Sequence, residues 1–139
     1  GEEGFISADS LEKARALGHI DSAVIDAWSA GDRLDEIAAN PADGDFAREL
    51  SLSLFQRSAR CMCVNLLAIA LLIDAGKEAD KPVCVCAEGS LVQRSHYYRP
   101  TLEKLLDTEG REKLGLHFRL FVGSETTLPG SAAAALLNC

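Results

Sequence analysis

The chain has 139 residues, of which 47% are apolar and 25% are charged, and its formal net charge is −7. This length suits one compact domain, and the composition is typical of a folded globular protein rather than a disordered one. The acidic balance excludes binding to nucleic-acid backbones as a main function, because such proteins carry a basic patch or stripe, and it gives no support to a membrane partner.

The longest apolar stretch covers residues 61–73 and is interrupted only by Asn65. It is too short to span a bilayer and predicts a buried core helix. The first four residues, Gly-Glu-Glu-Gly, include two acidic residues and no basic one, whereas a secretion signal starts with a basic segment. With five cysteines and no such signal, we expect reduced thiols in a cytoplasmic protein.

The first 44 residues predict an all-helical segment made of short helices with recognisable starts and stops. The first helix is capped by Asp9 or Ser10 and ends after residue 17, at Gly18. The second covers residues 23–30, starts at Asp21 or Ser22 and stops at Gly31. A third, short helix covers residues 33–39. Residues 40–44, with the sequence Asn-Pro-Ala-Asp-Gly, predict a loop by their turn chemistry.

Residues 45–139 predict a long helix followed by an α/β part, and we expect both to form one compact unit with the front segment. The helix is expected over residues 45–75, because apolar residues recur there at three- to five-residue steps. Residues 82–87 then form a short β-branched run, typical of a strand buried on both faces. A tight turn at 88–90 and a returning strand at 91–94 would complete a hairpin.

The remaining predicted elements alternate helix and strand. A helix is expected over residues 97–106, with Pro100 in its first turn, where proline is tolerated. A strand at 116–122, a loop at 123–129 and a small-residue helix at 130–137 follow. Two strands separated by a helix predict a right-handed crossover in a small parallel sheet, and therefore an α/β fold class.

The loop after the second strand is the best candidate site, because parallel sheets bind ligands where a strand ends and a helix begins. Residues 123–131 offer hydroxyls, backbone N–H groups and a helix start that favours anions. They lack the glycine-rich cradle and lysine that hold a triphosphate in a P-loop. The alternative is structural, with Thr126 or Thr127 capping a helix and Gly130 allowing close packing.

Other polar clusters are weaker candidates. Glu88 could be a catalytic carboxylate at a strand end, although a solvated turn residue is the favoured interpretation. The cluster at 94–99 combines basic and aromatic residues and could bind a phosphate or a nucleobase. The favoured interpretation is a strand-to-helix junction whose tyrosines pack on the core. The histidines lie in different predicted elements, and of the C-x-C pairs one is helical and one is in a strand, so we expect no metal site.

Five short segments together carry a family resemblance. They are RSARC at 57–61, NLLAI at 65–69, VCVCAEGSL at 83–91, YY at 97–98 and SETTLPGSAA at 124–133. In order and spacing they resemble the C-terminal segment of the hexokinase family from residue 45 to the end, with a weaker likeness over 5–37. The resemblance implies a partial RNase H-like domain of the actin-like ATPase superfold.

The resemblance also implies a site. In that family the terminal loop and the following helix contact the adenosine end of ATP, and the matching positions here are Glu125, Thr126, Thr127, Gly130 and Ser131. Leu128 and Pro129 replace the family's middle Gly-x, a departure that bears on nucleotide affinity and donor choice. ATP with Mg²⁺ and a hexose are the implied ligands of the full-length protein.

The parts that perform catalysis in that family have no counterpart in these residues. The phosphate loops, the sugar-binding residues and the catalytic Asp lie upstream of the matched segment, and no D-x-G-G-T-like element is present. We therefore expect a C-terminal fragment of an ATP:hexose phosphotransferase acting at the 6-hydroxyl, inactive alone. The alternative is a stand-alone, non-catalytic binding module derived from the same fold.

The resemblance further implies that other strands of the sheet are absent here. The strand at 83–87 would then have a bare edge, and bare edges invite association. We expect the isolated chain to self-associate.

Overall fold

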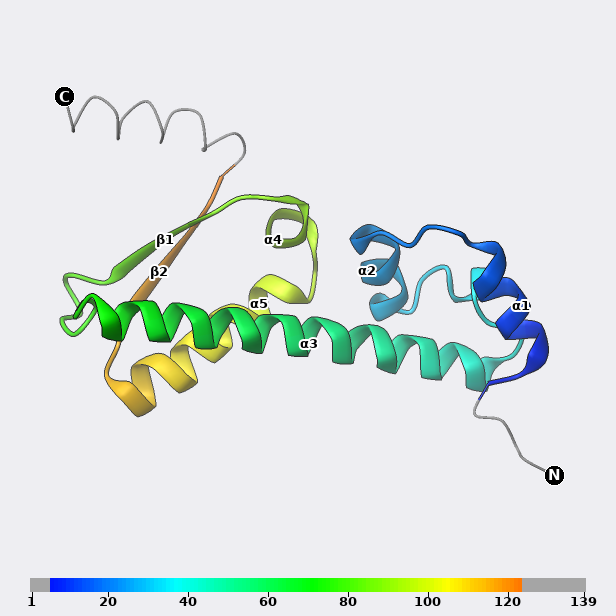
Figure 1. Cartoon of the computed structure of the whole chain (residues 1–139), viewed down its shortest axis with the longest axis horizontal. Coiled ribbons are helices and arrows are strands. Elements are labelled where there is room, and N and C mark those ends of the chain that lie inside the picture. Colours follow the sequence, from blue (N-terminus) through cyan, green and yellow to red (C-terminus); the bar gives the residue numbers. More distant parts are fainter. Residues whose placement is uncertain (1–5, 124–139) are drawn as a thin grey trace. The chain divides into compact units, whose positions relative to one another are not determined.

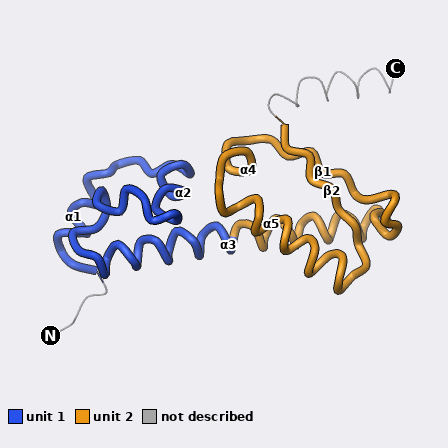
Figure 2. The backbone as a smooth tube through the Cα atoms, turned by 180° about the vertical axis from the view of Figure 1, so that it is seen from behind, with its two compact units in different colours: residues 1–57 blue, residues 58–139 orange. Residues whose placement is uncertain are grey.

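The computed structural model describes residues 6–123, and the chain divides into two compact units, Gly1–Arg57 and Ser58–Cys139 (Figure 2). Within the described range the elements are helical apart from one two-stranded sheet, so the predicted α/β class with a helical front and a small parallel sheet is confirmed (Figure 1).

The first unit opens with two short helices, and both end as the sequence predicts. Helix α1 spans Ala8–Ala16 and is followed by Gly18 at φ +64°, while α2 spans Ser22–Ala30 and stops at Gly31 in the left-handed region. Asp21 caps α2 by accepting from the Val24 N–H at 2.9 Å. The predicted cap of α1 is wrong, because Ser7 occupies that position and its side chain accepts from the Ser10 N–H.

The expected helix over 33–39 and the expected loop over 40–44 are both wrong. Only a 3₁₀ turn, Leu34–Glu36, forms in the first range, and the long helix α3 already begins at Pro41. Asn40 caps α3, since its side-chain oxygen accepts from the Asp43 N–H at 2.9 Å. Proline at the first helical position fits this arrangement, because its missing N–H would have had no helical partner.

Asp43 joins the starts of α1 and α3 (Pro41–Leu72). Its Oδ2 accepts from the Ser10 hydroxyl at 2.6 Å, from the Ser7 hydroxyl at 2.5 Å and from the Asn40 amide at 2.7 Å. Ser10 in turn accepts from the Ala39 N–H at 2.8 Å. These bonds satisfy polar groups that would otherwise be buried without partners, since Ser10 and Asp43 are both buried.

The apolar core of the first unit is small. It contains Trp28 from α2, Ala38, and Ala47 and Phe55 from α3, all buried. The indole N–H of Trp28 is buried without a hydrogen-bond partner within the described structure.

The second unit contains the sheet. Strands β1 (Val83–Ala87) and β2 (Phe118–Val122) pair in parallel, with Val83 opposite Phe118 and Ala87 opposite Val122. Between them lie three helical elements, α4 (Ser90–Arg94), α5 (Tyr98–Leu105) and a π-helix, η2 (Leu106–Glu112). The predicted helix–strand alternation is therefore confirmed, but the predicted returning strand at 91–94 is wrong, because these residues are helical.

Burial in both strands alternates, so the expectation of a strand buried on both faces is wrong. One sheet face is half-buried and carries Val83, Val85 and Leu120, whereas Cys84 and Cys86 on the other face are exposed. The half-buried face lies toward the helices: a Cβ on Gly110 of η2 would be 3.2 Å from Leu67 of α3 and 3.3 Å from the Phe118 ring.

The rear part of α3 packs through small residues. Ala59, Cys63 and Ala70 are almost fully buried, whereas the intervening Ile69 is 54% exposed. The expectation that 61–73 is a buried core helix is therefore wrong for most of its surface, because the described residues cover only one stripe of it. By length and apolar content alone α3 could cross a bilayer, a property that core helices of soluble proteins share.

The buried stripe of α3 gives a first prediction. Ala70 is fully buried, so Ala70→Leu adds three carbons to a closed site and should lower the free energy of unfolding by about 1–3 kcal/mol. Ala68 lies two residues earlier on the exposed side, so Ala68→Leu should be nearly neutral. Urea unfolding followed by far-UV circular dichroism compares the two variants, and equal losses would contradict this assignment of the buried stripe.

Candidate functional site

The carboxyl ends of β1 and β2 meet at one edge of the sheet. Ala87 and Val122 are paired there, and the N–H of Gly123 donates to the Ala87 carbonyl at 3.4 Å. In parallel sheets this is the edge at which ligands bind. The edge therefore presents the turn after β1 and the chain that continues from Gly123.

The turn after β1 leads into a helix rather than a hairpin. Gly89 has φ +119°, a backbone conformation that favours glycine. The N–H of Gln93 donates to the Gly89 carbonyl at 3.1 Å, and the Gln93 side-chain amide donates to the Gly123 carbonyl. Gln93 thus ties α4 to the end of β2, and the side chain of Glu88 is exposed at the same turn.

Gln93 is a residue of this edge that the sequence did not indicate. A strand at 91–94 would have pointed alternate residues to opposite faces, and nothing in a lone glutamine marks a link to a carbonyl 30 positions later. The available signal was Gly89 followed by Ser90, with Leu91 and Gln93 as residues of good helical propensity.

The basic and aromatic cluster at 94–99 forms the junction between α4 and α5. The Ser95 hydroxyl accepts from the backbone N–H groups of Tyr97 at 3.2 Å and Tyr98 at 3.0 Å, which starts α5. The Tyr98 side chain is buried, and Arg99 pairs with Glu103 at 2.9 Å. The structural interpretation of this cluster is therefore confirmed for Tyr98, although the element before it is a helix.

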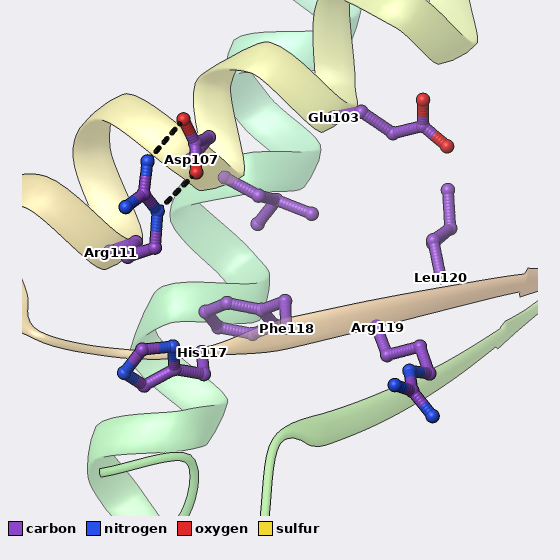
Figure 3. Close-up of a pocket in the computed structure, with 8 residues that line it drawn as sticks. Glu103, Asp107, Arg111, His117, Phe118, Arg119 and Leu120 are labelled. Carbon is purple, nitrogen blue, oxygen red and sulfur yellow. Dashed lines mark hydrogen bonds and ion pairs between the residues drawn. The ribbon is translucent and has the colours of Figure 1, made fainter. Parts of the chain in front are cut away.

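A cavity of about 330 Å³ lies between β2 and the helices that precede it (Figure 3). Leu120 points toward Glu103, whereas Arg119 points to the other side of the strand, as the alternation of a strand requires. The lining residues are Glu103, Leu106, Asp107, Arg111, His117, Phe118, Arg119 and Leu120.

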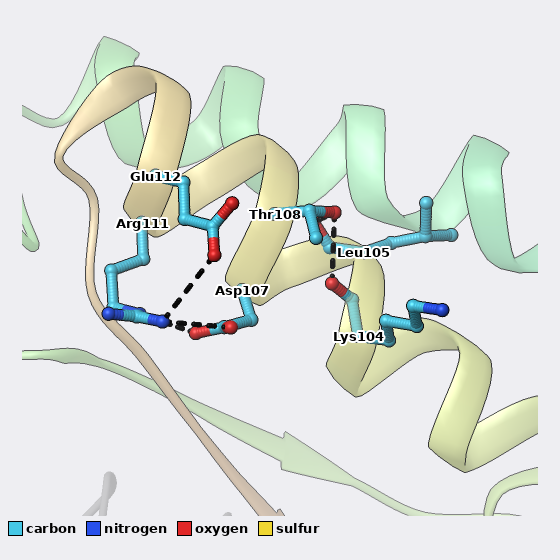
Figure 4. A network of polar contacts seen from close by, with 6 residues as sticks. All are labelled: Lys104, Leu105, Asp107, Thr108, Arg111 and Glu112. Carbon is cyan, nitrogen blue, oxygen red and sulfur yellow. Dashed lines mark hydrogen bonds and ion pairs between the residues drawn. The ribbon is translucent and has the colours of Figure 1, made fainter.

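The helix-borne charges of this cavity compensate one another. Asp107 and Arg111 form a two-pronged ion pair, in which the second bond, from Arg111 Nη2 to Asp107 Oδ2, measures 2.9 Å (Figure 4). Hydrogen bonding from Arg111 lowers the pKa of Asp107, and the same bond raises the pKa of Arg111. Glu112 lies 3.8 Å from Arg111 and completes the network. The cavity is therefore a weaker candidate for binding a charged ligand than the carboxyl edge of the sheet.

The cysteines and histidines of the described range do not gather into a metal site. Cys61 is exposed and Cys63 is buried, so they lie on different faces of α3, as the spacing predicts. Burial raises the pKa of the Cys63 thiol. Within residues 6–123, no group of three or more His, Cys, Asp or Glu side chains lies close enough together to hold a metal ion.

The predicted nucleotide-binding residues Glu125, Thr126, Thr127, Gly130 and Ser131 lie outside the described residues, as do the predicted loop beyond Gly123 and the helix at 130–137. The structure describes the chain up to Gly123, whose carbonyl and N–H are both held at the carboxyl edge of the sheet. The residue directly before the predicted loop is therefore placed at the expected edge.

A comparison with protein families resolves the identity of the chain. The family model described as Hexokinase matches residues 6–137, which is nearly the whole chain. The chain belongs to the hexokinase family. The resemblance first seen in short segments is thus confirmed, and the weaker likeness of the front part is included in the match.

Membership of the hexokinase family makes the chain a relative of sugar kinases, which are phosphotransferases. Neither the search of curated proteins nor the search of solved structures found a match. Within this hexokinase-family chain, the carboxyl edge of the sheet is the described region that leads directly into residues 124–131, where the sequence predicts the nucleotide-binding residues.

Proposed function

We propose that this chain is the C-terminal part of an ATP-dependent hexokinase that phosphorylates the 6-hydroxyl of a hexose, and that it supplies part of the adenosine-binding site. The observation that carries the proposal is the position of Gly123. It directly follows β2 at the carboxyl edge of a parallel sheet, and the family match continues past it to residue 137. The edge where ligands bind thus leads directly into residues 124–131.

The chemistry of the loop favours adenosine over the triphosphate. Residues 123–131 contain hydroxyl groups and one carboxylate but no lysine or arginine. Phosphoryl groups are bound by charge-assisted hydrogen bonds from Arg or Lys, often with Mg²⁺. Hydroxyls of Thr126, Thr127 and Ser131 and the carboxylate of Glu125 can instead bond to ribose and base, while Gly130 allows the backbone to approach the ligand closely.

The rest of the reaction is assigned to other parts of a longer enzyme. We propose that this chain completes an RNase H-like domain of the actin-like ATPase superfold, working in the cytoplasm. In this proposal the hexose, the catalytic base and the phosphate loops belong to upstream sequence. In this proposal Mg²⁺ enters with the nucleotide.

Competition binding tests the adenosine assignment. A fluorescent ATP analogue bound to the chain should be displaced by adenosine but not by inorganic tripolyphosphate, because the loop carries no cationic side chain. Thr127→Val should weaken adenosine binding about two- to tenfold, the effect of one lost hydrogen bond. Thr108→Val, in η2, removes a hydroxyl that donates a hydrogen bond to the Lys104 carbonyl, and this variant serves as the matched control.

Displacement by tripolyphosphate with adenosine inactive would contradict the proposal, as would an equal effect of both threonine variants. A coupled assay of hexose phosphorylation should show no turnover by the chain alone. Turnover would show that the catalytic centre is present after all. A chain that bound neither adenosine nor ATP would favour the alternative function, a non-catalytic interaction module of the sugar-kinase fold.

A further inference from the structure

The chain leaves the sheet at Gly123, and the peptide groups on both sides of its Cα are bonded. The Gly123 N–H donates to the Ala87 carbonyl at 3.4 Å, and the Gly123 carbonyl accepts from the side-chain amide of Gln93. The bond to the strand is long, since N–H···O bonds typically measure about 2.9–3.0 Å. The N–H of Gly123 is therefore held only weakly by β1, whereas its carbonyl is held by a side chain.

Strand β1 does not supply a partner for the Gly123 carbonyl. The strand ends at Ala87, which pairs with Val122, and the chain then turns into α4 at Gly89, where φ is +119°. Gly123 itself resists rotation little, because glycine has the widest backbone freedom of any residue. A bond from outside the β1–β2 ladder is what fixes the direction in which the chain continues, and Gln93 supplies that bond.

Gln93 can hold Gly123 in a fixed place because α4 is anchored at both ends. At its start, the Gln93 N–H donates to the Gly89 carbonyl at 3.1 Å. At its end, the Ser95 N–H donates to the Leu91 carbonyl at 3.3 Å, and the Ser95 hydroxyl accepts from the Tyr98 N–H at 3.0 Å. The Tyr98 side chain is 3% exposed, so α4 is connected to the core of the second unit.

We propose that Gln93 is a positioning residue for nucleotide binding: by holding the Gly123 carbonyl, it sets the direction in which residues 124–131 leave the sheet. This inference rests on the proposed function, since it concerns the same adenosine site. Gln93 acts through the backbone and does not itself have to contact the nucleotide. Its bond reduces the backbone freedom that is lost when adenosine binds, which raises the affinity.

The chemistry of the link requires a hydrogen-bond donor at position 93. The Gly123 carbonyl is an acceptor, and the Gln93 amide donates to it. Gln93 is exposed, so this bond competes with bonds to water and its net contribution is that of one ordinary hydrogen bond. Removing the donor should therefore weaken adenosine binding by about two- to tenfold, without unfolding the chain.

Adenosine affinity, measured by isothermal titration calorimetry on the full chain, tests the donor. Adenosine is uncharged, so a change of charge at position 93 has little direct effect on its binding. Gln93→Leu removes the amide, and Gln93→Glu keeps its shape but replaces the donor by a carboxylate, so each should weaken binding about two- to tenfold. Gln93→Lys restores a donor and should recover most of the affinity.

Gln56→Leu is the matched control, because it makes the same chemical change at an exposed helical position of the first unit. It should leave adenosine affinity unchanged. Urea unfolding should give nearly the same free energy of unfolding for Gln93→Leu and Gln56→Leu, since both side chains are exposed. A lower affinity of Gln93→Leu at equal stability would thus report positioning.

A double-mutant cycle with Thr127→Val separates positioning from a merely structural role. If Gln93 aligns residues 124–131, its removal should matter less once the Thr127 hydroxyl is absent. The double variant Gln93→Leu, Thr127→Val should therefore lose less affinity than the product of the two single losses. A merely structural role of Gln93 would give independent effects, and the double variant would then show the full product.

The outcomes distinguish this inference from the function on which it rests. If the unaltered chain binds adenosine and Gln93→Leu binds it equally well, this inference alone is overturned. Independent effects in the cycle would overturn it too, as would a Gln93→Lys variant that binds as weakly as Gln93→Leu. If the unaltered chain binds no adenosine, the proposed function fails and this inference fails with it.

Discussion

Gly76→Ala is expected to lower the free energy of unfolding by about 3 kcal/mol, whereas Gly115→Ala should lower it by only about 1 kcal/mol. Both glycines have positive φ, +80° and +66°, so both variants bear the backbone strain of a left-handed conformation. They differ in the space around them. A Cβ at Gly76 would be 2.8 Å from Val83 Cγ2 and 3.0 Å from the His117 carbonyl, whereas at Gly115 it would meet nothing within 4 Å.

The Gly76 prediction has a structural reason beyond local crowding. The Gly76 carbonyl accepts from the His117 N–H at 2.7 Å, and the His117 carbonyl accepts from Val83 at 2.8 Å. Gly76 therefore links the end of α3 to the beginning of both strands. Urea unfolding followed by far-UV circular dichroism measures the difference between the two variants. Equal losses would show that backbone strain alone, and not the close approach of the strands, explains why position 76 requires glycine.

Asp43→Ala is expected to lower the thermal midpoint of the first unit and to leave the hydroxyls of Ser7 and Ser10 and the amide of Asn40 without their shared acceptor. Losing one partner of a buried hydrogen bond is costly because the other group stays desolvated. Asp35→Asn, at an exposed carboxylate of the same unit, should have little effect. Thermal unfolding followed by circular dichroism compares them.

The same aspartate predicts how stability depends on pH. Hydrogen bonds from Ser10, then Ser7, lower the pKa of Asp43 in the folded chain. A carboxyl whose folded pKa is below its unfolded value, about 3.9, stabilises the fold above that pH. This contribution is lost as the pH falls through the lowered pKa. Asp43→Asn should therefore flatten the acid side of the stability profile, and an unchanged acid limb would contradict this role.

Helix ends were predictable wherever cap and stop signals were both present and unambiguous. Asp21 and Gly31 bound α2 as expected, because an acceptor side chain and a glycine at positive φ have few other uses at those places. The segment Asn-Pro-Ala-Asp-Gly at 40–44 was misread because the same residues serve a turn or a helix start. The carboxylate of Asp43, which collects donors from a segment more than 30 residues away, decides between them.

The sheet was predictable in its strands and their parallel direction but not in its surroundings. Residues 91–94 are a short run, which periodicity cannot assign to strand or helix. The burial of β1 depends on what covers its second face, and Cys84 and Cys86 carry no signal of that in sequence. For the site, residue pattern and topology predicted the carboxyl edge, while the roles of Glu125 to Ser131 rest on the family resemblance.

The burial of Trp28 has a spectroscopic consequence. This residue is the single tryptophan of the chain and belongs to the first unit, whereas the two tyrosines, Tyr97 and Tyr98, both belong to the second. Indole emission therefore reports the melting of the first unit alone and needs no label. Comparing it with far-UV circular dichroism, to which the helices of both units contribute, makes it possible to observe whether the units unfold together or in turn.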